Sequence, residues 1–139
     1  MTAQSMETIF IDGKKHYMAS EPFEQYLLSI ALAPEFYPPN TACWRGYTGT
    51  WKIEDDKLYL VNLNGYIKTP EKEYQGIDMN YFFPDQKIVF ADWFSGELRI
   101  PEGKMVQYIH MGYESLYEKD LILDITNGKV INRTELSNI

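Results

Sequence analysis

Apolar and polar residues alternate along much of this chain, which is the pattern of half-buried β-strands. Over residues 43–54, Tyr47, Gly49, Trp51 and Ile53 fall at alternate positions, with threonine and lysine between them. Because successive side chains of a strand point to opposite faces, this spacing predicts a strand with one face in the core. Residues 57–63 are apolar at both sets of positions, which predicts a central strand covered on two sides.

A second strand-rich region runs from residue 89 to residue 132. Its pattern predicts four antiparallel strands in a meander, over residues 89–100, 104–110, 116–126 and 129–132. Pro101 and Gly103 predict a turn between the first two strands, and Asn127-Gly128 predicts a hairpin between the last two. Ile122 is the apolar residue expected on the outer face of the third strand.

The N-terminal third predicts a hairpin and one helix. Residues 8–11 and 14–18 are expected to pair across Asp12-Gly13. Phe23, Leu27 and Ile30 have helical spacing, and Pro22 suits a first helical turn, so residues 22–32 are expected to form an amphipathic helix.

The remaining segments have weaker patterns. Residues 34–41 are expected to form a loop, Asn64-Gly65 a turn, and residues 68–75 an exposed excursion. Residues 77–83 fit either a short helical turn or a loop that enters the core. The expected fold is therefore mainly β (α+β). It is one domain with about eight strands in a curled antiparallel sheet, a half-barrel or a sandwich, and the helix closes one opening.

The charge composition narrows the range of partners. The chain has 20 acidic and 13 basic residues, a formal net charge of −7, and its basic residues form no run. Nucleic-acid backbones and anionic membrane surfaces are bound by clustered Lys and Arg, so neither is expected as a partner. An acidic surface remains able to attract a basic protein.

Cys43 and the hydropathy pattern bear on the compartment. A lone cysteine makes no intrachain disulfide, and Cys43 beside Trp44 is expected to be a small buried residue. No apolar run resembles a signal peptide or a bilayer-spanning helix, so the protein is expected to be cytoplasmic.

Few motifs carry recognisable chemistry. Phosphate-binding glycine loops and a serine nucleophile elbow are both missing. A metal site would need His110 and Glu114 with Asp92 or Glu97, but the chain has only two histidines. The simpler interpretation of His110 is a side chain that is hydrogen-bonded near the end of a strand. We expect no metal, no cofactor and no catalytic residues.

Asp92 is the most informative ionisable residue of the pattern. On a regular strand it would share the apolar face of Phe90 and Phe94, where a carboxylate needs a partner. Arg99 or Arg45 would supply that partner as an ion pair. A functional carboxylate and a bulge that exposes Asp92 are the two alternatives.

The aromatic residues have two interpretations. The side chains of Trp44, Tyr47, Trp51 and Trp93 are expected in the core or on its rim, and the alternative is an aromatic cleft that binds a small ligand. Tyr113-Glu114-Ser115 follows a glycine and is expected to form an exposed loop. The candidate residues for binding a ligand or partner are Trp44, Arg45, Tyr47, Asp92, Trp93, Glu97, Arg99, His110, Tyr113 and Glu114.

Three segments resemble a recurring pattern of small bacterial proteins of unknown function. They are CWRGYTGTWKIEDDKLYLVNL, VFADWFSGELRIPEGK and YIHMGYESLYEKDLILDITNGKV, which together cover roughly half of the chain. The resemblance implies a shared family and one fold. It implies no activity and assigns no functional residue.

These observations favour a non-catalytic acidic protein that binds a partner, for example an immunity- or inhibitor-type protein that covers a basic toxin or enzyme. The alternative is a small-ligand-binding β-barrel, with or without enzyme activity, using Arg45, Asp92, Arg99 and His110. A third hypothesis is self-association through exposed edge strands and Ile122.

Overall fold

The computed structural model describes residues 3–38, 40, 42–72 and 74–139. Pro39 and Thr41 of the expected loop and Glu73 of the expected excursion lie outside the described residues. The elements are β1 (Glu7–Ile11), β2 (Lys14–Met18), α1 (Phe23–Ser29), β3 (Tyr47–Glu54), β4 (Lys57–Ile67), β5 (Gln75–Asp78), the 3-10 helix η1 (Met79–Tyr81), β6 (Val89–Phe90), β7 (Gly96–Gln107), β8 (Leu116–Thr126) and β9 (Lys129–Ser137).

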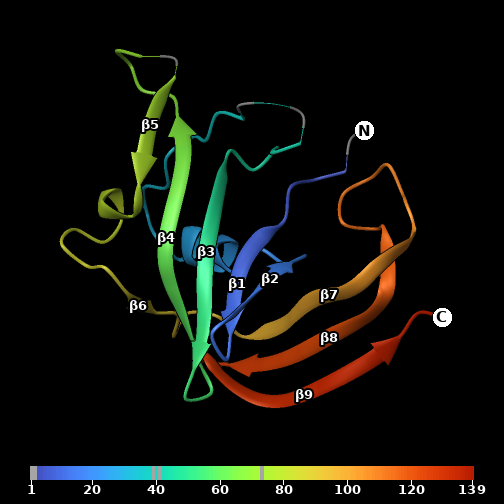
Figure 1. The fold of residues 1–139 in the computed structure, drawn as a ribbon. Coiled ribbons are helices and arrows are strands. Elements are labelled where there is room, and N and C mark those ends of the chain that lie inside the picture. Colours follow the sequence, from blue (N-terminus) through green and yellow to red (C-terminus); the bar gives the residue numbers. More distant parts are fainter. Residues whose placement is uncertain (1–2, 39, 41, 73) are drawn as a thin grey trace.

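The nine strands of the described residues form one bent, open sheet. Seven follow the order β2-β1-β3-β4-β9-β8-β7, while β5 and β6 both pair with β4. All pairs are antiparallel except β1 with β3. β4 and β9 share a single residue pair, Lys57 with Lys129, and Figure 1 shows the sheet turning sharply there. The expected mainly β fold, a curled sheet with one helix, is confirmed.

The core lies between the two arms of the bent sheet. Trp51 and Leu60 from the β3–β4 arm and Leu98 and Leu123 from the β7–β8 arm are fully buried. The alternation predicted for β3 is confirmed, because Tyr47, Gly49, Trp51 and Ile53 are all buried and the residues between them are not.

α1 lies behind β3 in the view of Figure 1. Phe23 is its fully buried residue, in ring contact with Tyr47, Phe82, Phe83 and Trp93. The helix is shorter than the 22–32 expected, because Ile30 has extended dihedrals and Leu28 and Leu32 find no core to pack on. Among the described residues, no helix has the length and apolarity needed to cross a membrane.

The expected four-strand meander is wrong. β6 ends at Phe90, a tight turn follows, and β7 then runs without a break through Pro101 and Gly103. The expected strands 89–100 and 104–110 are thus a two-residue strand and one long strand. The expected turn at Asn64-Gly65 is also wrong, because β4 continues to Ile67.

Candidate functional site

A buried ion pair joins β1 to the turn before β3. Arg45 Nη2 lies 2.7 Å from Glu7 Oε2, and the two side chains are 5% and 0% exposed. The Glu7 carboxylate also accepts hydrogen bonds from Gly49 N and Trp51 Nε1. Glu7 reaches this position because it shares the inner face of β1 with Ile9 and Ile11.

Burial and mutual attraction shift the pKa of both members of this pair. Burial raises the pKa of Glu7 above its ordinary value, against the opposing effects of Arg45, Gly49 and Trp51. Burial lowers the pKa of Arg45, but the combined effects of Glu7, Tyr113 and Glu21 raise it, so this pKa is raised overall. Within the described residues, Arg45 Nε and Nη1 are buried without a hydrogen-bond partner.

Two tyrosine–glutamate hydrogen bonds surround the ion pair. Tyr47 donates its hydroxyl to Glu24 on α1, and Tyr113 donates its hydroxyl to Glu21 just before α1. The Arg45 guanidinium lies 5.6 Å from the centre of the Tyr47 ring. These contacts fasten the start of α1 to β3 and to the β7–β8 loop.

The tyrosines predict a loss of stability in alkali. Burial, followed by the hydrogen bond to Glu24, raises the pKa of Tyr47 well above its ordinary value of 10.0. Burial, followed by the hydrogen bond to Glu21, raises the pKa of Tyr113 in the same way. A pKa raised by folding means that the unfolded chain loses the proton first, so stability falls as the pH rises above about 10. Tyr47→Phe should make the fall shallower by about 1.4 kcal/mol per pH unit.

The measurement is urea unfolding of wild type and Tyr47→Phe between neutral and strongly alkaline pH. Tyr17→Phe is the control, because Tyr17 lies on β2 with 55% of its surface exposed. The unfolding free energy of this variant should fall with pH as steeply as that of wild type. Equal slopes for Tyr47→Phe and wild type would show that the buried hydroxyl has no part in the alkaline loss.

Arg99 holds the β7–β8 loop in place. Its Nη1 and Nη2 donate to the carbonyl oxygens of Tyr113 and Ser115, and its Nε donates to Asp120. Ser115 closes the same loop by bonding both the N–H and the carbonyl of Ile109. The carboxylate partner of Arg99 is thus Asp120 and that of Arg45 is Glu7, so the Asp92 ion pair expected from the sequence does not form.

The N-terminal segment links the β7–β8 loop to the loop before β3. Gln4 N donates to Gly112 O, Ser5 N donates to Ala42 O, and Gln4 Oε1 accepts from Trp44 N. Figure 1 shows this segment running between the two loops. The two loops, residues 108–115 and 42–46, therefore lie side by side, and we call their shared surface the loop face.

The loop face exposes large apolar side chains. The exposed fractions are 44% for Trp44, 56% for Tyr108 and 45% for Met111. Tyr113 is half-buried beside them, while His110 and Glu114 are exposed on the same loop. His110 Nδ1 lies 2.7 Å from the Tyr108 hydroxyl, so the predicted histidine at a strand end has a partner.

Other predicted residues lie apart from the loop face. Asp92 is exposed because it lies in the turn after β6, and not because of a bulge in a strand. Trp93 packs in the aromatic cluster around Phe23 and donates to Pro22 O. Glu97 is exposed on β7, opposite Asp124. No group of three or more His, Cys, Asp or Glu side chains in the described part of the chain is placed to hold a metal ion.

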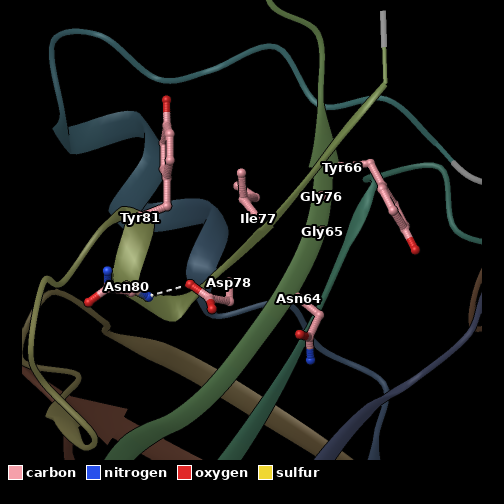
Figure 2. A pocket seen from close by; sticks show the side chains of 8 residues that line it. All are labelled: Asn64, Gly65, Tyr66, Gly76, Ile77, Asp78, Asn80 and Tyr81. Carbon is pink, nitrogen blue, oxygen red and sulfur yellow. Dashed lines mark hydrogen bonds between the residues drawn. The ribbon is translucent and has the colours of Figure 1, made fainter. Parts of the chain in front are cut away.

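A pocket of about 500 Å³ lies at β4, β5 and η1. Figure 2 shows Tyr81 and Ile77 projecting away from Tyr66 and Asn64, so the side chains that line the pocket do not converge on one point. Asp78 caps η1 by accepting from Asn80 N, and this bond accounts for its orientation. The pocket has no arrangement of groups that would fix a small ligand.

The sequence reasoning missed Glu7, Glu21 and Glu24. Glu7 was detectable, since the alternation of Ile9 and Ile11 extends back to it and places a carboxylate on the apolar face. Glu21 and Glu24 gave no such signal, because their tyrosine partners lie far away in the sequence. No protein-family model, curated protein or solved structure matches this chain.

Proposed function

We propose that this protein is a non-catalytic binding protein whose loop face docks onto a basic protein. The observation that carries the proposal is the exposure of Trp44, Tyr108 and Met111 on two adjoining loops. Tryptophan and tyrosine dominate the binding energy of protein interfaces, and methionine adapts to varied partners. Large apolar side chains grouped on one exposed surface are typical of interaction sites.

Hydrogen bonds hold the described parts of both loops in place, which supports this use. Arg99 fixes the carbonyl oxygens of the β7–β8 loop, and Gln4 connects that loop to Trp44. A preordered surface loses less conformational entropy on association than a mobile one. The buried Arg45–Glu7 pair anchors the base of the same surface to β1 and β3.

The charge supports a basic partner. The net charge is −7, and Glu114 adds an exposed carboxylate beside the apolar residues of the loop face. Complementary charge speeds association and favours partners of opposite sign. One form of this function is an immunity- or inhibitor-type protein that covers a basic toxin or enzyme.

The alternative, a small-ligand-binding barrel with or without enzyme activity, has less support. It requires Arg45, Asp92, Arg99 and His110 to converge. Arg45 and Arg99 are each engaged by a carboxylate of their own, and Asp92 is exposed in the turn after β6. We therefore favour the binding protein.

The test is affinity capture from the native cytosol with three immobilised proteins at low and high salt. They are wild type, Trp44→Ala/Met111→Ser on the loop face, and the matched control Leu28→Ala/Ile88→Ser, which removes exposed apolar residues elsewhere. A basic partner should bind wild type and control equally and the loop-face variant about tenfold less or weaker still, and high salt should release it. Equal capture by all three proteins, or no salt-sensitive partner at all, would refute the proposal.

A further inference from the structure

β9 presents a free sheet edge. It pairs with β8 along its length, whereas β4 pairs with it only at Lys129. Residues 131–137 are all exposed, and Figure 1 shows β9 as the outermost strand of its arm of the sheet. Unpaired backbone N–H and C=O groups along such an edge are a template for a further strand.

From Asn132 to Ser137, the odd-numbered residues of β9 direct their backbone groups to this free edge. Asn138 N donates to Glu118 O, which places residues 138 and 118 in a hydrogen-bonded pair of the β8–β9 ladder. In an antiparallel ladder such pairs alternate with pairs whose backbone groups point outward. Across the unbulged part of β9, Arg133, Glu135 and Ser137 therefore have N–H and C=O groups available to a partner strand.

The other long edge strand, β7, carries features that oppose pairing, and β9 does not. β7 contains Pro101, which lacks an N–H, and its register with β8 shifts twice, near Met105. Proline and bulges protect sheet edges from a partner strand. From Asn132 to Ser137, β9 has no proline and no shift.

We propose that β9 pairs antiparallel with β9 of a second copy of this chain, about a two-fold axis at Thr134. In this register Arg133 of each copy faces Glu135 of the other, and both residues belong to the outward-bonding set. Shifting the register by two residues either way brings Arg133 opposite Arg133 or Glu135 opposite Glu135. Opposite charges across a strand pair are stabilising and like charges are destabilising, so the charge pattern selects the proposed register.

The present partners of these two residues are weak competitors. Arg133 Nη2 lies 3.3 Å from Asp56, and Glu135 lies 3.9 Å from Lys119, all with substantially exposed side chains. Exposed ion pairs contribute little, so both residues are free to reorient toward a second copy. A single strand pair buries less than a standard interface, so a dissociation constant on the order of 10 to 100 µM is expected.

The first test is sedimentation of the full chain over a concentration series up to about 1 mM, well above that dissociation constant. Wild type should dimerise, Arg133→Glu and Glu135→Arg should each weaken the dimer about tenfold or more, and the double charge swap should restore it. A wild type that stays monomeric, or a dimer that Arg133→Glu leaves unchanged, would overturn the proposal. A dimer that the double swap fails to restore would do the same.

The second test fixes the register by cysteine cross-linking. Thr134 would face itself at about 4.5 Å between Cα atoms, which is within disulfide range. Thr134→Cys should therefore form a covalent dimer under mild oxidation. Asn132→Cys is the matched control on the same exposed strand face, because two copies of position 132 would lie about 13 Å apart. Faster cross-linking at position 132 than at position 134 would exclude the proposed axis. Cys43 is buried and stays unchanged in both variants.

Discussion

Arg45→Met should lower the free energy of unfolding by about 3 to 5 kcal/mol, because it leaves the fully buried Glu7 carboxylate without its counter-ion. Gly49 N and Trp51 Nε1 would remain as its hydrogen-bond donors. The substitution also removes the two unpartnered donors of Arg45, whose burial costs about 1 to 3 kcal/mol. We therefore expect the lower end of the range, measured by urea unfolding.

Two controls separate the buried charge from general disturbance. Lys52→Met breaks the Lys52–Glu54 pair, whose side chains are 31% and 57% exposed, and should cost less than about 1 kcal/mol. The double variant Glu7→Met/Arg45→Met removes both charges and should be more stable than Arg45→Met alone. A double variant less stable than Arg45→Met would show that Glu7 stabilises the fold even without Arg45, and does more than neutralise the buried charge of its partner.

The pH dependence of the same variant follows from the sign of the shift. Burial already raises the pKa of Glu7, and removing Arg45 takes away an effect that lowers it. A carboxyl group whose pKa is raised by folding destabilises the fold as the pH rises from the pKa of the unfolded chain, about 4.3, to that of the folded chain. The deficit of Arg45→Met should therefore shrink in acid.

The missed Glu7–Arg45 pair shows where sequence reasoning stops. The period of two predicted the inner face of β3 correctly, because burial selects side chains residue by residue. The partner of a buried charge depends on which strands lie side by side. Here a parallel pairing of β1 with β3 brings Glu7 close to a residue 38 positions away, and no local pattern encodes that distance.

Gly65 and Pro101 are residue types typical of turns, but both lie inside strands, and tertiary contacts account for their presence there. Gly65 suggested a turn, yet a Cβ there would lie 2.8 Å from Tyr47 Cβ and 2.9 Å from Gly46 O. The absence of a side chain at Gly65 allows β4 to approach β3 closely. Pro101 also suggested a turn, but it lies within β7, which is an edge strand of the sheet, and there a missing N–H is tolerated.

The charged candidates illustrate the same limit. Asp92 was expected on a strand face, but the chain turns after Phe90 and exposes it. Arg99 instead pairs with Asp120, which β8 presents on the outer face of the adjacent strand. Residue types suited to an ion pair were recognisable in the sequence, while the choice of partner followed from the register of β7 with β8.

Phe23→Ala should destabilise the protein by about 3 to 5 kcal/mol, because it empties the centre of the aromatic cluster beneath α1. Phe23 is fully buried and lies against Tyr26, Tyr47, Phe82, Phe83 and Trp93 at ring distances of 5.0 to 6.4 Å. Aromatic pairs of this kind add about 0.5 to 1.5 kcal/mol beyond the area that they bury. Urea unfolding followed by tryptophan fluorescence gives the free energy.

Leu28→Ala is the matched control for Phe23→Ala, since Leu28 lies on the same helix with 88% of its surface exposed and should change stability by less than about 0.5 kcal/mol. α1 has seven residues, too few for a helix to persist in water without tertiary packing. If Phe23→Ala cost no more than Leu28→Ala, the helix would not be closing the sheet. If Phe23→Ala does displace α1, Glu24, which accepts a hydrogen bond from Tyr47, loses its fixed position as well. The stability of α1 and the anchoring of the Arg45–Glu7 region therefore depend on the same buried ring.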